Sequence, residues 1–97
     1  MPTYEWVRRF RRDFMDLTPE QQRLFLQAVV QFVEDLAEAK GFRKGLRVKG
    51  VQDAPGVFEM TWANDGRATF EYGPSHVEGQ SHIIWRRVGT HAIFTAP

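Results

Sequence analysis

The hydrophobic positions at the start of the chain repeat with helical spacing. Phe10, Phe14 and Leu17 lie four and three residues apart, so they share one face of a short amphipathic helix over residues 8–17, with arginines on the other faces. The preceding run, Thr3 to Val7, is rich in β-favouring types and is predicted to form a short opening strand.

A second helix is predicted to begin after Thr18. Its hydroxyl can cap the helix, Pro19 suits the first helical position, and Gln21 can return a hydrogen bond to the cap backbone. Gly41, preceded by a lysine, is predicted to end the helix in the left-handed conformation. A wide apolar stripe supports the helix between these ends: Leu24, Phe25, Ala28, Val29, Phe32, Val33 and Leu36.

The second half of the chain alternates apolar and polar residues, as strands do. Val57 to Trp62 and Arg67 to Tyr72 are predicted to form a hairpin around a three-residue loop, Asn64 to Gly66, with the glycine in the left-handed position. In this register Trp62 faces Ala68, and the large apolar residues share one face.

The remaining segments complete one domain. His82 to Val88 is predicted to be a further strand, whereas Leu46 to Val51 fits either a short edge strand or an extended loop. The predicted fold class is α+β: an N-terminal helical hairpin packed on one face of a small antiparallel sheet, in a single domain over residues 1–97.

The composition excludes several kinds of functional site. The 97 residues are 42% hydrophobic, which suffices for one core, and the absence of cysteine excludes disulfides, thiolate metal sites and a cysteine nucleophile. No apolar run approaches the roughly 18 residues of a membrane-spanning helix. We therefore expect a soluble protein with no membrane partner, and the lack of cysteine fits the reducing cytoplasm.

The net charge of +1 hides an uneven distribution. Two basic clusters flank an acidic helix, a pattern that fits a nucleic-acid surface but also fits solvated faces with ordinary ion pairs. The first cluster is Arg8, Arg9, Arg11 and Arg12, and the second is Lys40, Arg43, Lys44, Arg47 and Lys49.

The opposite face of the predicted hairpin is the strongest candidate site. Its polarity can serve solubility alone, or it can serve chemistry: Glu59 opposite Glu71 would raise one carboxyl pKa, and Arg67 could stabilise a phosphate. The structural alternative makes these carboxylates cross-strand partners of Arg86. The face comprises Glu59, Thr61, Arg67, Thr69 and Glu71.

Among the three histidines, His91 is the candidate general acid or base, because it follows Gly89 at a strand end and histidine titrates near neutral pH. His76 and His82 flank a loop and are expected to be surface residues without a role. Since the histidines are scattered and no glycine-rich phosphate loop is present, we expect no metal ion and no nucleotide cofactor.

The order of these elements resembles the RelE/ParE toxin superfamily. The resemblance covers nearly the whole chain and depends on the helical hairpin, the run Gly56 to Trp62, the arginine that opens the next strand, and the ending Gly89-Thr90-His91 followed by an aromatic residue at Phe94.

This resemblance implies a bacterial type II toxin that enters the ribosomal A site and cuts mRNA without a metal ion, through attack of a ribose 2′-hydroxyl on the neighbouring phosphate. Arg67 matches the phosphate-stabilising arginine of the family, and His91 matches the residue that handles protons. The resemblance also implies a cognate antitoxin as partner, and ribosomal RNA contacts for Arg8, Arg9, Arg12, Arg43, Lys44, Arg47 and Lys49.

The sequence departs from the family pattern at two places. Glu59 and Thr61 stand where some members have lysines, and Phe94, which cannot transfer a proton, stands where many have a terminal tyrosine. Glu59 as base and His91 as acid is a reasonable assignment, with Arg86 as a second positive charge. Two alternatives stay open: a ParE-like toxin that inhibits DNA gyrase, and a non-enzymatic RNA-binding module.

Overall fold

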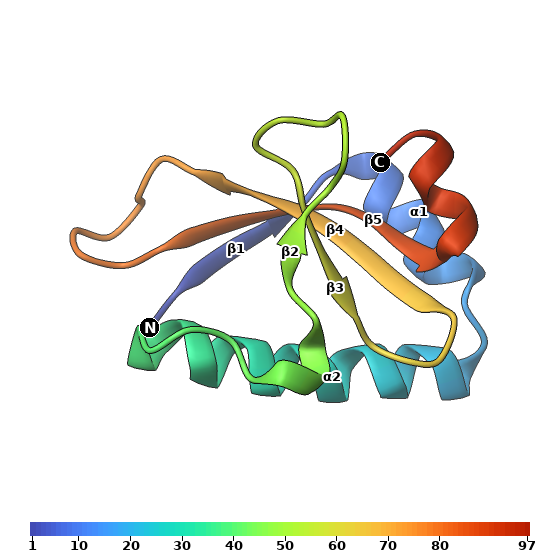
Figure 1. The fold of residues 1–97 in the computed structure, drawn as a ribbon, viewed down its shortest axis with the longest axis horizontal. Coiled ribbons are helices and arrows are strands. Elements are labelled where there is room, and N and C mark those ends of the chain that lie inside the picture. The colour runs from blue at the N-terminus through green and yellow to red at the C-terminus, as the bar shows by residue number, and fades with distance from the viewer.

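The fold is a five-stranded sheet with one long helix beneath it and a short helix at its side (Figure 1). The computed structural model describes residues 1–97. The strands are ordered β1-β5-β4-β3-β2. The elements, in chain order, are β1 (Thr3–Trp6), α1 (Arg8–Asp16), α2 (Pro19–Glu38), the 3₁₀ helix η1 (Lys44–Leu46), β2 (Lys49–Gly50), β3 (Phe58–Thr61), β4 (Gly66–Gly73), β5 (His82–Thr90) and the 3₁₀ helix η2 (His91–Thr95).

The α+β class is confirmed, with one correction to the sheet. Strands β2 to β5 are antiparallel to their neighbours, but β1 pairs with β5 in parallel, so the sheet is mixed. The β-favouring residues of the opening segment predict a strand but carry no information about its partner. That partner, the last strand of the chain, is reached only after the helical hairpin and three other strands.

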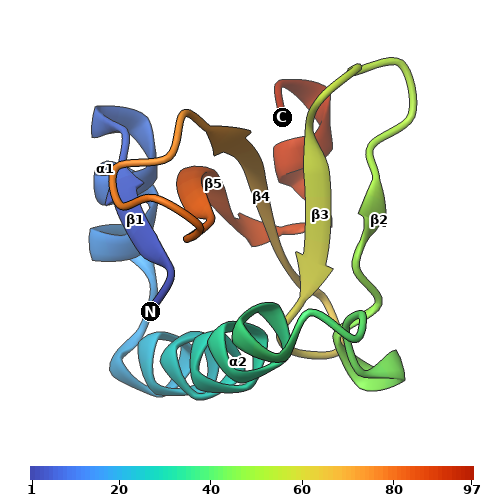
Figure 2. The same cartoon turned by 90° about the vertical axis from the view of Figure 1, so that its left-hand side faces the viewer.

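Helix α2 covers one face of the sheet along its whole length (Figures 1 and 2). Phe25 and Phe32 project from it onto Trp85 of β5, at ring-centroid distances of 5.6 and 5.2 Å. Thr18 and Gln21 form the expected capping box, with both reciprocal hydrogen bonds present. These aromatic contacts make the sheet side of α2 the centre of the core.

The C-terminus of α2 differs from the prediction. The helix ends at Glu38, and Ala39 takes the left-handed conformation with φ of 57°, two residues before Gly41, whose φ is also positive. The backbone N–H of Ala39 still donates to the Asp35 carbonyl, so a cap hydrogen bond is made without glycine.

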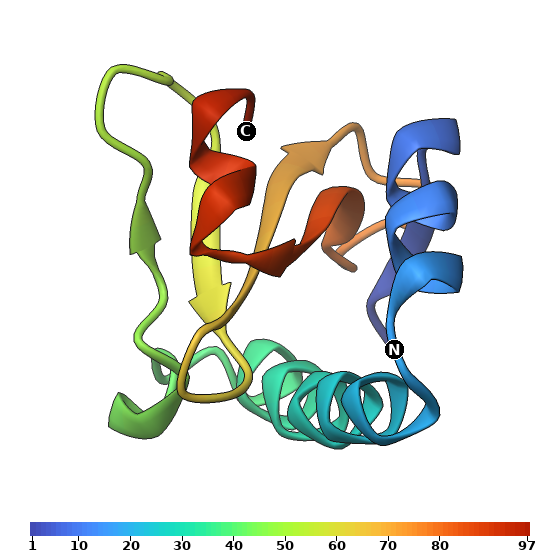
Figure 3. The same cartoon turned by 90° about the vertical axis from the view of Figure 1, so that its right-hand side faces the viewer.

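Helix α1 stands at the side of the sheet, beside β5 (Figure 3). Strand β1 accompanies β5 only as far as Trp85, and α1 occupies the space next to the residues that follow. Phe10 is fully buried against Trp85, while Asp13 accepts a hydrogen bond from the backbone N–H of Val88 at 3.2 Å. A helix side chain thus satisfies the edge that the short strand leaves unpaired.

The β3–β4 hairpin has the predicted faces but a different register. Trp62 pairs with Gly66, since its N–H donates to the Gly66 carbonyl at 3.1 Å, and Met60 rather than Trp62 lies opposite Ala68. The loop is therefore residues 63–65, and Gly66 is a strand residue. A shift of two residues keeps every side chain on its own face, which is why the predicted apolar face survives.

Neither helix is both long and apolar enough to cross a membrane.

Candidate functional site

The second face of the sheet, opposite α2, carries a β-bulge that gathers two arginines. Thr69 pairs with Arg87 and Phe70 pairs with Trp85, which leaves Arg86 as the extra residue of β5. Trp85 and Val88 are both buried in the core, so the two arginines between them face the other way. The bulge doubles the positive charge that a regular strand would place there.

Each of these arginines has an acidic partner. Arg86 pairs with Glu71 of β4, which is the cross-strand pair that the structural alternative predicted. Arg87 donates to Asp13 of α1 from Nε at 2.7 Å and from Nη2 at 3.1 Å. The guanidinium groups are therefore held in place rather than free in solvent.

The end of the chain covers part of this face. Thr69, which is completely buried, donates to the Pro97 carbonyl at 3.0 Å, and Arg86 donates to the same oxygen at 3.2 Å. Ile93 of η2 lies over Gly89, where an added Cβ would be 3.0 Å from its Cγ2. The expectation of an uncovered face is thus wrong at this end, because the apolar residues that follow β5 fold back onto it.

A third arginine reaches the same region from α1. Arg9 donates to the Ala96 carbonyl at 3.0 Å, and Arg87 donates to that oxygen at 3.1 Å. Burial first, and then the neighbouring Arg87 charge, lower the pKa of Arg9, while Asp13 opposes the shift. Arginine keeps its charge in proteins, so Arg9, Arg86 and Arg87 form a cationic cluster at the edge of the second face.

Arg67 belongs to this face and supports the hairpin turn. Its Nη1 donates to the carbonyls of Ala63, Asn64 and Gly66 at 3.2, 3.2 and 2.9 Å. Its side chain is half-buried, and neither Nε nor Nη2 has a hydrogen-bond partner in the protein. The turn therefore fixes the guanidinium and leaves two nitrogens available to a ligand.

His91 is the first residue of η2 and is exposed. Its ring meets Phe94 edge to face, with centroids 5.0 Å apart. Arg67 pairs with Gly89, two residues before His91, so both candidates belong to the same end of the β4–β5 hairpin.

Glu59 lies on the second face further along β3. It is half-buried, and its register partners are Lys49 on β2 and Thr69 on β4. Arg67 is the diagonal neighbour of Glu59 across β3 and β4, a relation that separates Cα atoms by about 7–8 Å and Cβ atoms by somewhat less.

The two predicted basic clusters do not form one surface. Helix α1 and η1 lie on opposite sides of the molecule in Figures 2 and 3. On α1, a shallow surface cavity is lined by Arg8, Arg11 and Arg12 together with Met15 and Asp16.

In the second basic cluster, Arg43 is already bound by acidic side chains of α2. Its guanidinium donates to both carboxylate oxygens of Asp35 at 2.9 Å and to Glu34 at 3.1 Å. The hydrogen bond with Asp35 is the main reason that the pKa of Arg43 is raised. Arg43 therefore fastens the connector to α2, whereas Lys44, Arg47 and Lys49 are exposed and make no ion pair.

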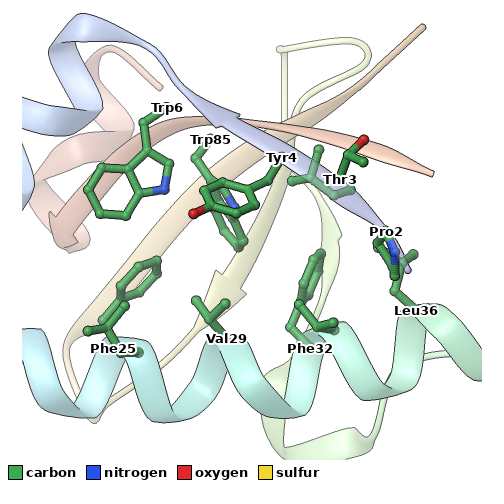
Figure 4. A pocket seen from close by; sticks show the side chains of 12 residues that line it. Pro2, Thr3, Tyr4, Trp6, Phe25, Val29, Phe32, Leu36 and Trp85 are labelled. Atoms are coloured by element: carbon green, nitrogen blue, oxygen red, sulfur yellow. The ribbon is translucent and has the colours of Figure 1, made fainter. Parts of the chain in front are cut away.

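A separate apolar groove runs between α2 and the outer strand β1 (Figure 4). Its cavity volume is about 160 Å³. Tyr4 and Leu26 line it and remain 67% and 46% exposed, so the groove presents apolar side chains to solvent. The sequence does not predict this groove, because Tyr4 fits the pattern of a strand and Leu26 lies outside the predicted apolar stripe of the helix. Its other linings include Trp6, Phe25, Val29, Val33, Leu36 and Trp85.

Comparison with known proteins gives the fold. No protein-family model matches the chain, and no curated protein matches it by sequence. YafQ from E. coli strain BL21(DE3) is 14% identical, with 95% of this chain and 96% of that chain covered and a TM-score of 0.58. The YoeB/ParE toxin from Agrobacterium tumefaciens is 10% identical, with coverages of 92% and 98% and a TM-score of 0.66. A chain of the RelBE2 toxin–antitoxin complex from Mycobacterium tuberculosis is 23% identical, with coverages of 94% and 100% and a TM-score of 0.57. The expected RelE/ParE-like type II toxin fold is thereby confirmed.

Proposed function

We propose that this chain is the toxin of a bacterial type II toxin–antitoxin system and acts in the cytoplasm as a ribosome-dependent endoribonuclease on mRNA. The proposal is supported by the RelE/ParE-like fold and, above all, by one observation: Arg67 of the arginine-rich face pairs with Gly89, two residues before His91. Basic residues of α1 and of the connector between α2 and β2 are proposed to contact ribosomal RNA. They are Arg8, Arg9, Arg12, Arg43, Lys44, Arg47 and Lys49. Arg43 has the smallest part in this, because acidic neighbours neutralise it.

The proposed reaction needs no metal ion. The ribose 2′-oxygen attacks the adjacent phosphorus, the bond to the 5′-oxygen breaks, and the products are a cyclic phosphate and a 5′-hydroxyl. The free nitrogens of Arg67 stabilise the charge on the phosphorane, and Arg86 adds a second positive charge. Glu59 takes the proton of the 2′-hydroxyl, and His91 donates a proton to the leaving oxygen.

Mapping of mRNA 5′ ends in a translation extract tests this proposal. Discrete cuts are expected with the native chain, and His91→Ala should slow cleavage by about 10²–10⁴-fold, the usual contribution of a general acid. Arg67→Ala should reduce cleavage by about 10²–10³-fold. The matched control is Arg23→Ala, which removes an exposed arginine paired with Glu20 on the other side of the molecule.

Because Arg67 also holds the hairpin turn, its variant requires a thermal melt alongside the activity assay. His91 is exposed and makes no hydrogen bond, so His91→Ala should melt like the native chain. Uncut mRNA on intact ribosomes would contradict the nuclease. Equal cleavage by the native chain and both variants would contradict the roles assigned to Arg67 and His91.

Two alternatives have support of their own. Phe94 beside His91 cannot transfer a proton, which favours a ParE-like toxin that inhibits DNA gyrase, and a supercoiling assay distinguishes it. The hydrogen bonds of Arg67 to loop carbonyls favour a non-enzymatic RNA-binding module. In that case Arg67→Ala changes only a salt-sensitive RNA affinity and no cleavage is seen with the native chain.

The apolar groove is the proposed docking site of the antitoxin. β1 is an outer strand, so its free edge can pair with an added strand whose alternate side chains enter the groove. Arg8 and Arg11 adjoin the groove at Trp6, which fits acidic residues flanking the apolar segment. Among the structural neighbours, DinJ–YafQ and RelB–RelE are toxin–antitoxin complexes.

Co-purification with the protein encoded next to this gene tests the docking site. Leu26→Asp should abolish co-purification, because it puts a charge into the apolar groove. Gln27→Asp, an exposed change at the next position of α2, is the matched control and should leave co-purification intact. Equal behaviour of the two variants would place the partner elsewhere.

A further inference from the structure

His76 and His82 lie side by side at the N-terminal end of β5, the end away from His91. The sequence had suggested no role for either of them. His82, expected on the surface, is only 2% exposed, because Gly73 opposite it has no side chain: a Cβ there would be 3.0 Å from the His82 ring. His76, from the exposed β4–β5 loop, stacks on this ring with centroids 3.7 Å apart.

A carboxylate and a hydroxyl from β1 complete the cluster. Glu5 Oε1 lies 2.8 Å from Nε2 of His82, and Thr3 Oγ1 lies 2.7 Å from Nδ1. The ligand atoms of Glu5, His76 and His82 all lie within 4.8 Å of one another. Strand β1 and the β4–β5 hairpin, which are distant in sequence, thus bring two imidazoles and one carboxylate to a single place on the second face.

We propose that Glu5, His76 and His82 form a binding site for a divalent transition-metal ion, with zinc as the representative ion. Zinc takes nitrogen and oxygen ligands at about 2.0–2.2 Å and often has three protein ligands plus water in the fourth position. Imidazole with carboxylate suits zinc, copper and nickel rather than magnesium or calcium.

The buried half of the site is already arranged for this task. Thr3 occupies Nδ1 of His82 and so orients Nε2 toward Glu5, as outer-shell partners of metal-bound histidines do. The stacked rings, only 15° apart in plane, cannot both direct in-plane lone pairs at one ion. His76 therefore turns on binding, which its exposed loop permits.

The ion has a structural consequence and no part in the proposed cleavage. It would add a link between the outer strand β1 and the β4–β5 loop, which are already joined by hydrogen bonds from Met1 to Gln80 Oε1 at 2.7 Å and from Thr3 N–H to the Ser81 carbonyl at 2.9 Å. β5 rises by about 3.3 Å per residue, so the site lies roughly 25–30 Å from His91 at the other end of the strand.

Titration of the native chain with zinc and with cobalt tests the proposal. One equivalent of zinc should bind in calorimetry, cobalt should give visible d–d bands, and zinc at 100 times its Kd should raise the Tm by on the order of 10 °C.

The variants separate the site from adventitious histidine binding. His76→Ala should abolish the cobalt bands without changing the Tm of the metal-free chain, because His76 is exposed. Thr3→Val should weaken zinc binding by about 10–100-fold while leaving the ligands in place. His91→Ala is the matched control and should bind zinc normally.

Absence of binding at 100 µM zinc, cobalt bands that persist in His76→Ala, or bands that vanish in His91→Ala would each overturn the proposal. Neither result bears on mRNA cleavage, so the two proposals fail independently.

Discussion

Asp13 of α1 makes three hydrogen bonds to β5 at the second face, so replacing it by alanine tests how that face is held. Its carboxylate accepts from Arg87 Nε at 2.7 Å, from Arg87 Nη2 at 3.1 Å and from Val88 N at 3.2 Å. The side chains of Arg87 and Asp13 are only 19% and 15% exposed. Asp13→Ala therefore leaves one guanidinium and one backbone N–H without their main acceptor.

The size of the effect follows from this geometry. Hydrogen bonds to charged groups contribute about 1.5–3 kcal/mol each, and breaking a fully buried ion pair costs about 3–5 kcal/mol. Partial exposure reduces the cost, and so does the bond that Arg87 keeps with the Ala96 carbonyl. We expect Asp13→Ala to lower the free energy of unfolding by about 2–4 kcal/mol and the Tm by roughly 10–25 °C.

Urea denaturation followed by tryptophan fluorescence measures this loss. A double-mutant cycle with Arg87→Ala should give a coupling energy of about 1–2 kcal/mol between the two side chains. Asp16→Ala, an exposed change on the same helix, is the matched control and should stay within about 0.5 kcal/mol of the native chain. Equal losses for Asp13→Ala and Asp16→Ala, or no coupling in the cycle, would refute the reasoning.

Two further predictions concern the hairpin and the helix end. Gly66→Ala should lower the free energy of unfolding by about 1–3 kcal/mol in urea denaturation, because the new Cβ would lie 2.6 Å from the buried Trp62 ring. Gly50→Ala is the control and should lower it far less, because nothing lies within 4 Å of a Cβ there. A larger loss for Gly50→Ala than for Gly66→Ala would contradict this packing. Hydrogen bonds from the Arg43 side chain and backbone lower the pKa of Asp35 from its ordinary 3.8, so this stabilisation is present above pH 3.8 and is lost as the pH falls through the lowered value. Thermal melts from pH 7 to pH 2 should show that Asp35→Asn removes this part of the acid sensitivity, whereas unchanged sensitivity excludes the pair as its source.

The apolar pattern predicts the helices and strands well because each of them buries one face. The stripe of α2 and the cap at Thr18 mark that helix, and alternation marks β3 and β4. The predicted hairpin register was wrong because the sequence allows a three-residue loop at residues 64–66 or at residues 63–65. Gly66 is the last loop residue in the first case and the first residue of β4 in the second. Only the packed structure shows that the Trp62 ring needs that position to lack a side chain, which makes Gly66 a strand residue.

The candidate site was less predictable, because its shape depends on contacts between distant segments. The sequence does not reveal the bulge at Arg86, because two adjacent arginines do not show which of them is the extra residue. The bulge is seen only in the strand register and in the burial of Trp85 and Val88 on either side. Ile93 offered a signal, since an apolar residue shortly after a strand end often returns to cover a face. The meeting of His76 with His82 depends on the course of the β4–β5 loop, which no local pattern specifies.

The groove and the proposed reaction centre lie on different sides of the sheet, and this separation constrains how a partner could inhibit the chain. Tyr4 and Trp6 face the α2 side, whereas Arg67 belongs to the opposite face. A segment that only fills the groove therefore leaves the arginine face open to RNA. Inhibition by occlusion requires the same partner to continue past α1, where Arg8 and Arg11 adjoin the groove and Arg9 reaches the second face. Helix α1 is thus the shared border of both surfaces, and its arginines are where partner and RNA would compete.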